Sequence, residues 1–290
     1  MSYYQILGFQ KEPFSTSPDP EFLYMSREHE TVLTNTLIEL NLQRGLSVIF
    51  GDVGTGKTTL SRKLIQELGK RHKFLFQIVL NPSFESEADF LRYLMSNFGI
   101  PAESADGEKY PLMELRDRFE KFLLAKTLNE KRIVAVIIDE AQKLGEESLE
   151  TLRIILNYET NEFKLIQIVL LGQMELHSKI SRVQNFRDRI SFKFKFYPFD
   201  LDETREMINF RIRKAGYEGR TGLFMDDAIR EIHMYTGGYP RSITMFCHKA
   251  LKELLLKNKY VVDVPLVRSI IESERDLIWQ TKNYQQSKNY

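Results

Sequence analysis

Residues Gly51–Thr58 read Gly-Asp-Val-Gly-Thr-Gly-Lys-Thr and fit the pattern Gly-x-x-x-x-Gly-Lys-[Ser/Thr]. Glycines in such a loop let the backbone wrap a phosphate chain and point its N–H groups inward. The lysine reaches the β- and γ-phosphates, and the next hydroxyl is a ligand for Mg²⁺. We therefore expect an ATP·Mg²⁺ site with Thr58 on the metal and with nucleotide contacts from Gly51, Asp52, Val53, Gly54, Thr55, Gly56, Lys57, Thr58 and Thr59.

Two carboxylates, Asp139 and Glu140, follow directly after the apolar run Ile133–Ile138. In phosphate-loop ATPases a buried strand ends in such acidic residues. We expect Asp139 to hold the metal through its water shell, and Glu140 to orient and activate the attacking water. A solvated acidic pair at a strand end is the alternative interpretation, but the phosphate loop upstream favours the catalytic one.

A glutamine and three arginines are further candidates for phosphoryl chemistry. Gln173 follows the apolar run Leu165–Leu171, so we expect it at the same sheet edge, within reach of the γ-phosphate or the water. Cations are needed where charge develops on the transferring phosphoryl group, and the candidates are Arg187, Arg189 and Arg241. An arginine from a neighbouring subunit would couple hydrolysis to assembly. The alternatives are a capping or surface glutamine and ordinary surface arginines.

Short apolar runs that alternate with helical periods would position these residues. The runs cover 46–50, 74–80, 133–138, 165–171 and 192–197, and the helical stretches cover about 57–72, 86–98, 111–128, 146–160 and 173–183. Strands that alternate with helices pair in parallel, because each crossover carries the chain back across the sheet. The sequence thus predicts an α/β fold with a five-stranded parallel sheet between helices.

After Pro198 only helical patterns recur. Helices are predicted near 202–215, 225–236, 240–257 and 265–280, with Asp202 as the N-cap of the first and Pro240 in the first turn of the third. The opening segment is rich in aromatic residues and proline, so we expect it to be irregular. The predicted domains are the opening segment 1–25, an α/β domain over 26–198, a smaller all-α domain over 199–280 and a flexible tail over 281–290.

The composition is that of an ordinary globular protein. Its 41 basic and 40 acidic residues give a net charge of +1, which creates no general bias toward nucleic acid or anionic lipid. Cys247 is the one cysteine, which excludes an intrachain disulfide, and no Cys/His spacing suggests zinc. The amino terminus does not read as a signal peptide, and the longest apolar run is far shorter than a membrane helix. We expect a cytoplasmic protein without direct membrane insertion.

With these motifs in place, the chain resembles the general secretion pathway protein A family (ExeA/GspA) of AAA+ ATPases over residues 1–275. Besides the phosphate loop, the resemblance rests on Tyr4…Phe9, Pro13-Phe14, Pro18-Asp19-Pro20-Glu21-Phe22-Leu23-Tyr24, Ser26, His29-Glu30, Ile138-Asp139-Glu140-Ala141-Gln142, Gly172-Gln173-Met174-Glu175-Leu176 and Gly237-Gly238-Tyr239-Pro240-Arg241. Met174 departs from the proline that is usual in the family. The chain looks like a short form, without the membrane helix and peptidoglycan-binding module of many members.

The resemblance implies a phosphate-loop AAA+ core that is followed by a helical lid. It also implies individual roles: Gln173 as the sensor on the fourth strand, Arg241 as the sensor in the lid, Pro13 and Phe14 as contacts that seat the adenine, and Arg189, with Arg187 second, as the inter-subunit finger. The family further implies a homo-oligomer, as a ring or filament, that hydrolyses ATP as an assembly or accessory factor. The machine would be an envelope secretion or pilus system, with a membrane-associated partner that holds the protein at the inner membrane.

The alternative function is a DNA-binding AAA+ ATPase of the transposition-regulator type, which oligomerises on DNA. Residues 179–195 hold one acidic residue, Asp188, against six basic ones: Lys179, Arg182, Arg187, Arg189, Lys193 and Lys195. Lys193 and Lys195 alternate with phenylalanines and so occupy one face of a strand. Lysines also protect an exposed edge strand from aggregation, which makes DNA the less favoured partner. A small-molecule kinase is a third hypothesis, but Asp139-Glu140 and Pro240-Arg241 argue for hydrolysis.

Overall fold

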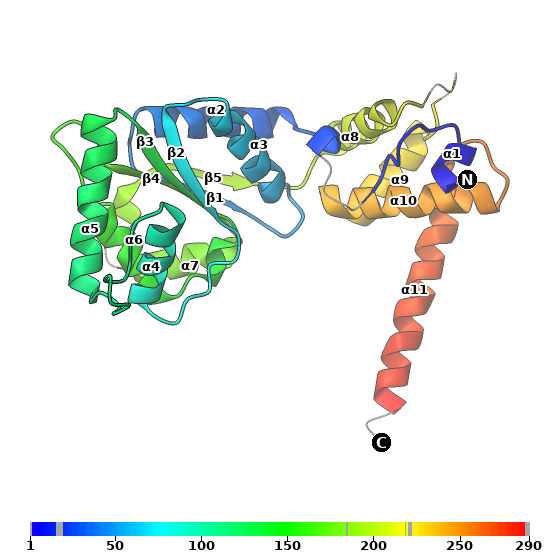
Figure 1. Cartoon of the computed structure of the whole chain (residues 1–290). Coiled ribbons are helices and arrows are strands. Elements are labelled where there is room, and N and C mark those ends of the chain that lie inside the picture. The colour runs from blue at the N-terminus through cyan, green and yellow to red at the C-terminus, as the bar shows by residue number, and fades with distance from the viewer. Residues whose placement is uncertain (1, 16–19, 184, 218, 220–221, 288–290) are drawn as a thin grey trace. The chain divides into compact units, whose positions relative to one another are not determined.

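The structure is a computed structural model that describes residues 2–15, 20–183, 185–217, 219 and 222–287. The chain divides into two compact units, whose elements are labelled in Figure 1. An α/β unit holds residues 27–53 and 57–197, and a helical unit holds residues 1–26, 54–56 and 198–290. Among the residues that carry the family resemblance, Pro18 and Asp19 lie outside the described part of the chain.

Within the described residues, the α/β unit is built around five strands: β1 (Leu46–Gly51), β2 (Phe74–Val79), β3 (Ile133–Ile138), β4 (Ile166–Gly172) and β5 (Ile190–Phe196). The strand order is β2-β3-β4-β1-β5, and every neighbouring pair is parallel. Strands β1, β3 and β4 are buried along their whole length, as their continuous apolar runs predict for strands covered on both faces. The predicted five-stranded parallel sheet between helices is confirmed.

Helices cover both faces of this sheet (Figure 1). One face carries α2 (Arg27–Asn41) and α3 (Lys57–Gly69). The other face carries α4 (Glu87–Asn97), α5 (Leu112–Leu124), α6 (Glu146–Ile155) and α7 (Met174–Arg182). Short helical turns complete the unit: η2 (Ala125–Asn129), η3 (Ala141–Lys143) and η4 (Arg187–Arg189).

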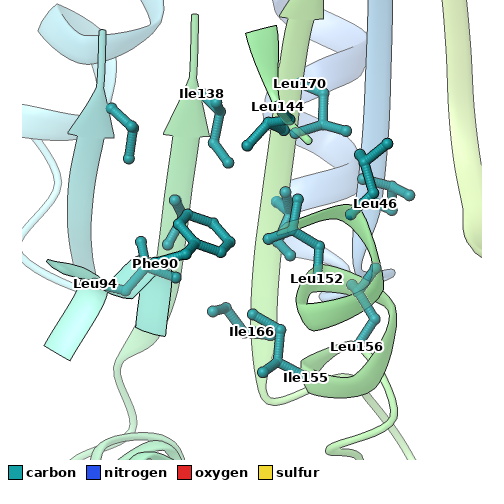
Figure 2. Packing of buried hydrophobic residues seen from close by; sticks show 14 of the residues in the cluster. Leu46, Phe90, Leu94, Ile138, Leu144, Leu152, Ile155, Leu156, Ile166 and Leu170 are labelled. Carbon is teal, nitrogen blue, oxygen red and sulfur yellow. The ribbon is translucent and has the colours of Figure 1, made fainter. Parts of the chain in front are cut away.

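Figure 2 shows the core on the side of α4 to α7. Successive strand residues point to opposite faces of a sheet, so alternate residues of each strand enter this core. Side chains from β1, β3 and β4 meet those of α4, of α6 and of the residues directly after η3 and α6, among them Leu46, Ile138, Ile166, Leu170, Phe90, Leu94, Leu144, Leu152, Ile155 and Leu156. Each such buried side chain contributes about 1.5–3 kcal/mol, and together they stabilise the strand ends that carry the candidate site.

Strand β5 lies at an edge of the sheet, and its side chains alternate between an exposed and a covered face. Lys193 and Lys195 are exposed, as the alternation of lysine with phenylalanine predicts. On the other face Phe196 is buried and stacks on the ring of His29 in α2, at 4.4 Å between ring centroids. The lysines therefore stand on the solvent side of an edge strand.

The helical unit consists of α1 (Tyr3–Ile6), η1 (Pro20–Phe22), α8 (Leu201–Lys214), α9 (Asp226–Thr236), α10 (Pro240–Leu256) and α11 (Val264–Ser287). The sequence predicts an irregular opening segment that helps to form the nucleotide pocket. In the structure this segment shares a core with α8 to α11, since Phe9, Phe14 and Phe22 are buried there, and its part in the nucleotide pocket stays a prediction. Burial of three phenylalanines supplies the free energy that orders an otherwise irregular chain.

Two helix ends of this unit differ from the predictions. Asp200, not Asp202, is the N-cap of α8: its Oδ1 accepts the N–H of Glu203 at 2.8 Å, and Glu203 Oε2 accepts the N–H of Asp200 at 3.2 Å. A glutamate three residues later completes a capping box only for Asp200. Helix α11 continues to Ser287 rather than ending near 280, because no glycine or proline interrupts residues 266–287. Residues 288–290 of the predicted tail lie outside the described residues.

Pro240 occupies the first turn of α10, where its fixed φ suits a helix start, as predicted. In the part of the chain that the structure describes, no helix combines the length and the hydropathy needed to cross a membrane.

Candidate functional site

The phosphate loop lies between the last residue of β1 and the first residue of α3. Gly54 and Gly56 have φ angles of +85° and +101°, in the region that glycine adopts without a steric penalty. Thr55 between them is fully buried. The loop therefore turns sharply and ends at the amino terminus of a helix, whose free N–H groups and positive dipole end favour an anion.

Lys57 is the first residue of α3 and is only 5% exposed. Its Nζ donates hydrogen bonds to the carbonyl oxygens of Gly51 at 2.7 Å and Asp52 at 2.9 Å. Burial lowers the pKa of Lys57, while the nearby carboxylates of Glu140 and Asp139 act in the opposite direction. A buried ammonium group at the amino terminus of a helix is a suitable partner for a polyphosphate. The attraction between the ammonium and the phosphate charges would offset the cost of removing both from water.

Asp139, directly after β3, faces the same helix. Its carboxylate is buried, and Oδ2 lies 3.3 Å from the hydroxyl of Ser61 in α3. The Ser61 hydroxyl also lies 3.2 Å from the carbonyl oxygen of Thr58. Burial raises the pKa of Asp139, and hydrogen bonds from the Glu140 N–H and from Ser61 partly counter that shift. The Ser61 hydroxyl thus connects the carboxylate that follows β3 with the first turn of α3.

These residues fit a magnesium ion of the kind that binds together with a nucleotide. Such an ion takes one or two protein oxygens and fills its octahedron with phosphate oxygens and waters. Thr58 is an exposed residue in the first turn of α3, and the Ser61 hydroxyl lies near both the Thr58 carbonyl oxygen and the Asp139 carboxylate. A divalent cation would also stabilise the ionised form of a carboxylate that burial disfavours.

Glu140 adopts a left-handed backbone conformation, with φ 53° and ψ 35°. This conformation costs a residue other than glycine about 1–3 kcal/mol, and such strain clusters at functional sites. Two backbone groups hold it: the Glu140 N–H donates to Asp139 Oδ1 at 2.9 Å, and the Glu140 carbonyl accepts from the Lys143 N–H at 2.9 Å. These two contacts fix the backbone of Glu140 directly after Asp139.

Gln142, a residue to which the sequence patterns assigned no role, connects Glu140 with the end of β4. Its Nε2 donates to Glu140 Oε2 at 2.7 Å, and its Oε1 accepts the backbone N–H of Gln173 at 3.0 Å. Gln173 itself stands at the N-cap position of α7, where its side chain makes no capping hydrogen bond. The signal for Gln142 was the Asp-Glu-Ala-Gln string, but only the fold of η3 turns this side chain back toward both partners.

The two arginines before β5 lie near the end of the strands that is opposite the phosphate loop. Because β5 is parallel to β1 and Ile190 is in register with Leu46, Arg187 and Arg189 stand near the amino-terminal end of β1. The phosphate loop follows Gly51 at the opposite end, roughly 17 Å away at 3.3 Å per residue. Arg187 is exposed and Arg189 is partly exposed. Their backbone therefore lies toward the end of β1 that is opposite the phosphate loop.

The remaining predicted residues lie in the helical unit. Arg241 is exposed in the first turn of α10. Pro13 and Phe14 are buried, and the Phe14 ring packs against Phe224 at 5.8 Å between centroids. An adenine contact through Phe14 would require its ring to leave this core. The roles of all three residues toward the nucleotide stay predictions.

Comparison with known proteins gives a consistent result. Residues 40–180 match the family model described as "AAA domain". The chain is 34% identical over 285 residues to "General secretion pathway protein A" from Aeromonas hydrophila. This alignment covers 96% of the chain and 50% of the relative, so the chain spans about half the length of that protein.

Solved structures with the same fold are more distant in sequence. The ORC2 protein of Aeropyrum pernix, determined in complexes with ADPNP and ADP, aligns with a TM-score of 0.62 at 18% identity, over 91% of this chain and 71% of that one. The RuvB Holliday junction branch migration motor of Thermotoga maritima aligns with a TM-score of 0.57 at 14% identity, over 87% of this chain and 73% of that one. These likenesses show that the chain has the AAA+ fold.

Proposed function

Because the chain belongs to the AAA+ proteins and is related along 96% of its length to general secretion pathway protein A, we propose that it is an ATPase that serves an envelope secretion or pilus system. The reaction is the hydrolysis of ATP to ADP and phosphate. The observation that carries the proposal is the 3.3 Å contact between Asp139 and Ser61. It joins the predicted metal-binding carboxylate to the helix that begins at the phosphate loop.

Each residue of the site has a separate task in this reaction. Lys57 neutralises the β- and γ-phosphates, and Thr58 and Asp139 would hold a magnesium ion, which when bound spreads the charge of the phosphate oxygens. Glu140 orients the attacking water and accepts its proton. Gln173 senses the γ-phosphate at the end of β4.

A complete site also needs a cation against the charge that develops in the transition state. Arg189, with Arg187 second, is the proposed source, and it acts on the site of a neighbouring subunit. Arg189 lies near the amino-terminal end of β1, and the phosphate loop follows the other end of that strand. This position supports a role in trans rather than in cis. Arg241 is the proposed contact from the helical unit. The working protein is then a homo-oligomer, as a ring or filament.

The biological process that we propose rests on the similarity to general secretion pathway protein A and on how much of this chain the similarity covers. General secretion pathway protein A is related to this chain across both of its units. We assign this chain the role of an assembly or accessory factor that a membrane-associated partner recruits to the inner membrane from the cytoplasm. That relative is about twice as long as the aligned region, so the proposal concerns only the half that this chain matches.

A second candidate function is DNA binding by an ATPase that oligomerises on DNA. The specific observation is the exposed face of β5, which carries Lys193 and Lys195 two residues apart on the same strand. Solved neighbours with this fold include a DNA branch migration motor. An edge strand also uses lysines to block pairing with other strands, so this face is weaker support than the nucleotide site.

One experiment tests both candidates. ATP turnover and oligomer size are measured with and without duplex DNA over a salt series. We expect turnover that requires Mg²⁺ and does not respond to DNA. Stimulation by DNA that weakens steeply with salt, and that is lost in a Lys193→Glu/Lys195→Glu variant, would replace the secretion role with the DNA-binding one. No turnover in any oligomeric state would overturn the ATPase proposal.

A further inference from the structure

Gln142 forms a continuous hydrogen-bonded path between two strand ends at the candidate site. On one side its Nε2 donates to Glu140 Oε2 at 2.7 Å. On the other side its Oε1 accepts the backbone N–H of Gln173 at 3.0 Å. The path therefore runs from the residue after β4, through one amide, to the carboxylate after β3.

The two partners leave the amide of Gln142 a single orientation. A carboxylate only accepts hydrogen bonds and a backbone N–H only donates them. Rotation of the amide by 180° would set its oxygen against Glu140 and its NH₂ group against the Gln173 N–H, so both contacts would become repulsive. The Gln142 side chain can therefore serve both partners in one way only, and its position is tied to theirs.

The surroundings keep this amide in place. Lys179 of α7 donates from Nζ to the carbonyl oxygens of Gln142 at 2.6 Å and Leu144 at 2.8 Å, which binds η3 to α7. At Gly172 an added Cβ would come within 3.2 Å of Gln142 Oε1 and 2.7 Å of Leu176 Cδ2. The last residue of β4 thus lacks a side chain at the point where the amide passes.

We infer that Gln142 is a positioning residue that couples the backbone of Gln173 to the carboxylate of Glu140. A displacement at the end of β4, where the γ-phosphate is sensed, moves the Gln142 amide and with it the carboxylate that orients the attacking water. The amide holds Oε2 of Glu140, and Oε1 would be the oxygen that takes the proton of the attacking water. This inference rests on the proposed ATPase function and makes hydrolysis, rather than nucleotide binding, depend on Gln142.

The main test is the near-isosteric substitution Gln142→Glu. It keeps an oxygen for the Gln173 N–H but sets a second carboxylate against Glu140. We expect kcat to fall about 10- to 100-fold, the range for a misplaced catalytic group, with KM for ATP and Kd for ADP within about twofold of wild type. The matched control is Gln66→Glu on the exposed side of α3, which makes the same chemical change away from the site and should leave kcat unchanged.

A double-mutant comparison shows whether Gln142 acts through Glu140. Gln142→Ala should lower kcat in the wild-type background but cause no further loss in a Glu140→Gln background, because the group that it positions is already gone. An equal loss in both backgrounds would overturn the inference. So would a wild-type kcat in Gln142→Glu, or an effect confined to KM.

Two further measurements separate this inference from the proposed function and from misfolding. If wild-type protein hydrolyses ATP and Glu140→Gln does not, normal turnover in both Gln142 variants defeats the inference alone. If wild-type protein has no turnover, or Glu140→Gln retains it, the proposed function and the inference fall together. Should Gln142→Glu lose ADP binding, the shorter Gln142→Asn, which cannot span both partners, must show the same fall in kcat with intact ADP affinity.

Discussion

The ammonium of Lys57 lies 2.7 Å from the carbonyl oxygen of Gly51, so the first residue of α3 and the last residue of β1 are joined across the phosphate loop. This contact ties the two ends of the loop together. It also places a buried positive charge beside two carboxylates, Asp139 and Glu140.

Substitution Lys57→Ala should weaken ATP binding about 10- to 150-fold, because it removes a charge-assisted hydrogen bond worth about 1.5–3 kcal/mol. Titration with a fluorescent ATP or ADP analogue measures the change. The control is Lys70→Ala. Lys70 is exposed, lies just beyond the end of α3 and pairs with Glu67 of that helix. An ATP affinity equal to that of wild type would remove Lys57 from the phosphate site.

Substitution Glu140→Gln should leave ATP affinity unchanged and lower kcat by at least about 100-fold, because the amide cannot accept the proton of the attacking water. Phosphate release under single-turnover conditions gives the rate of the chemical step. Glu147→Gln, an exposed glutamate in the first turn of α6, should hydrolyse ATP at the wild-type rate. Turnover at the wild-type rate in Glu140→Gln would assign the water to another residue.

Substitution Asp139→Asn should stabilise the metal-free protein near pH 8 while abolishing its response to Mg²⁺. Burial raises the pKa of Asp139, so the folded protein binds this proton more tightly than the unfolded chain does. The ionised carboxylate therefore destabilises the fold above the raised pKa, and that penalty disappears as the pH falls toward the unfolded value of about 3.9.

Thermal unfolding without metal at pH 8 and pH 4 checks this sign. The variant should have the higher Tm at pH 8, by about 2–4 °C for each kcal/mol gained, and the difference should vanish at pH 4. A lower Tm for Asp139→Asn at pH 8 would mean that the carboxylate stabilises the fold, contrary to the cost of its burial.

If Arg189 acts in trans, Arg189→Ala should reduce turnover by about 100-fold or more while each subunit still binds ATP. Mixing it with Lys57→Ala subunits should restore part of the turnover, since each variant supplies the group that the other lacks. Arg182→Ala, an exposed arginine at the end of α7, is the matched control. Specific activity that is independent of protein concentration, with no restoration on mixing, would contradict the assignment.

Substitutions of Phe14 distinguish a role in the core of the helical unit from a contact with adenine. Because its side chain is fully buried, Phe14→Ala should destabilise the helical unit by about 3–5 kcal/mol, whereas Phe14→Leu should cost much less. We expect Phe14→Leu to keep wild-type affinity for ADP, as measured by titration. A Phe14→Leu variant with unchanged Tm but weakened ADP binding would instead show that the ring stacks on the base.

Local patterns in the sequence were enough to predict the α/β fold and the strand ends that carry the site. The phosphate loop, the apolar run that ends in Asp139 and the alternating lysines of β5 are each readable from a few neighbouring residues. Turn glycines, period-2 alternation and continuous apolar runs have physical causes that act over one element. These features therefore did not depend on knowing the tertiary structure.

Contacts between distant segments were decided only by the tertiary structure. The Ser61 hydroxyl meets Asp139 because α3 packs against the end of β3, and Gln142 reaches Gln173 because η3 folds back over β4. The family resemblance implies an adenine contact for Phe14, and only the structure shows that its ring packs in a core formed with helices some 200 residues away. A hydrogen bond or a buried ring needs a partner in space, and the sequence alone does not state which distant residue supplies it.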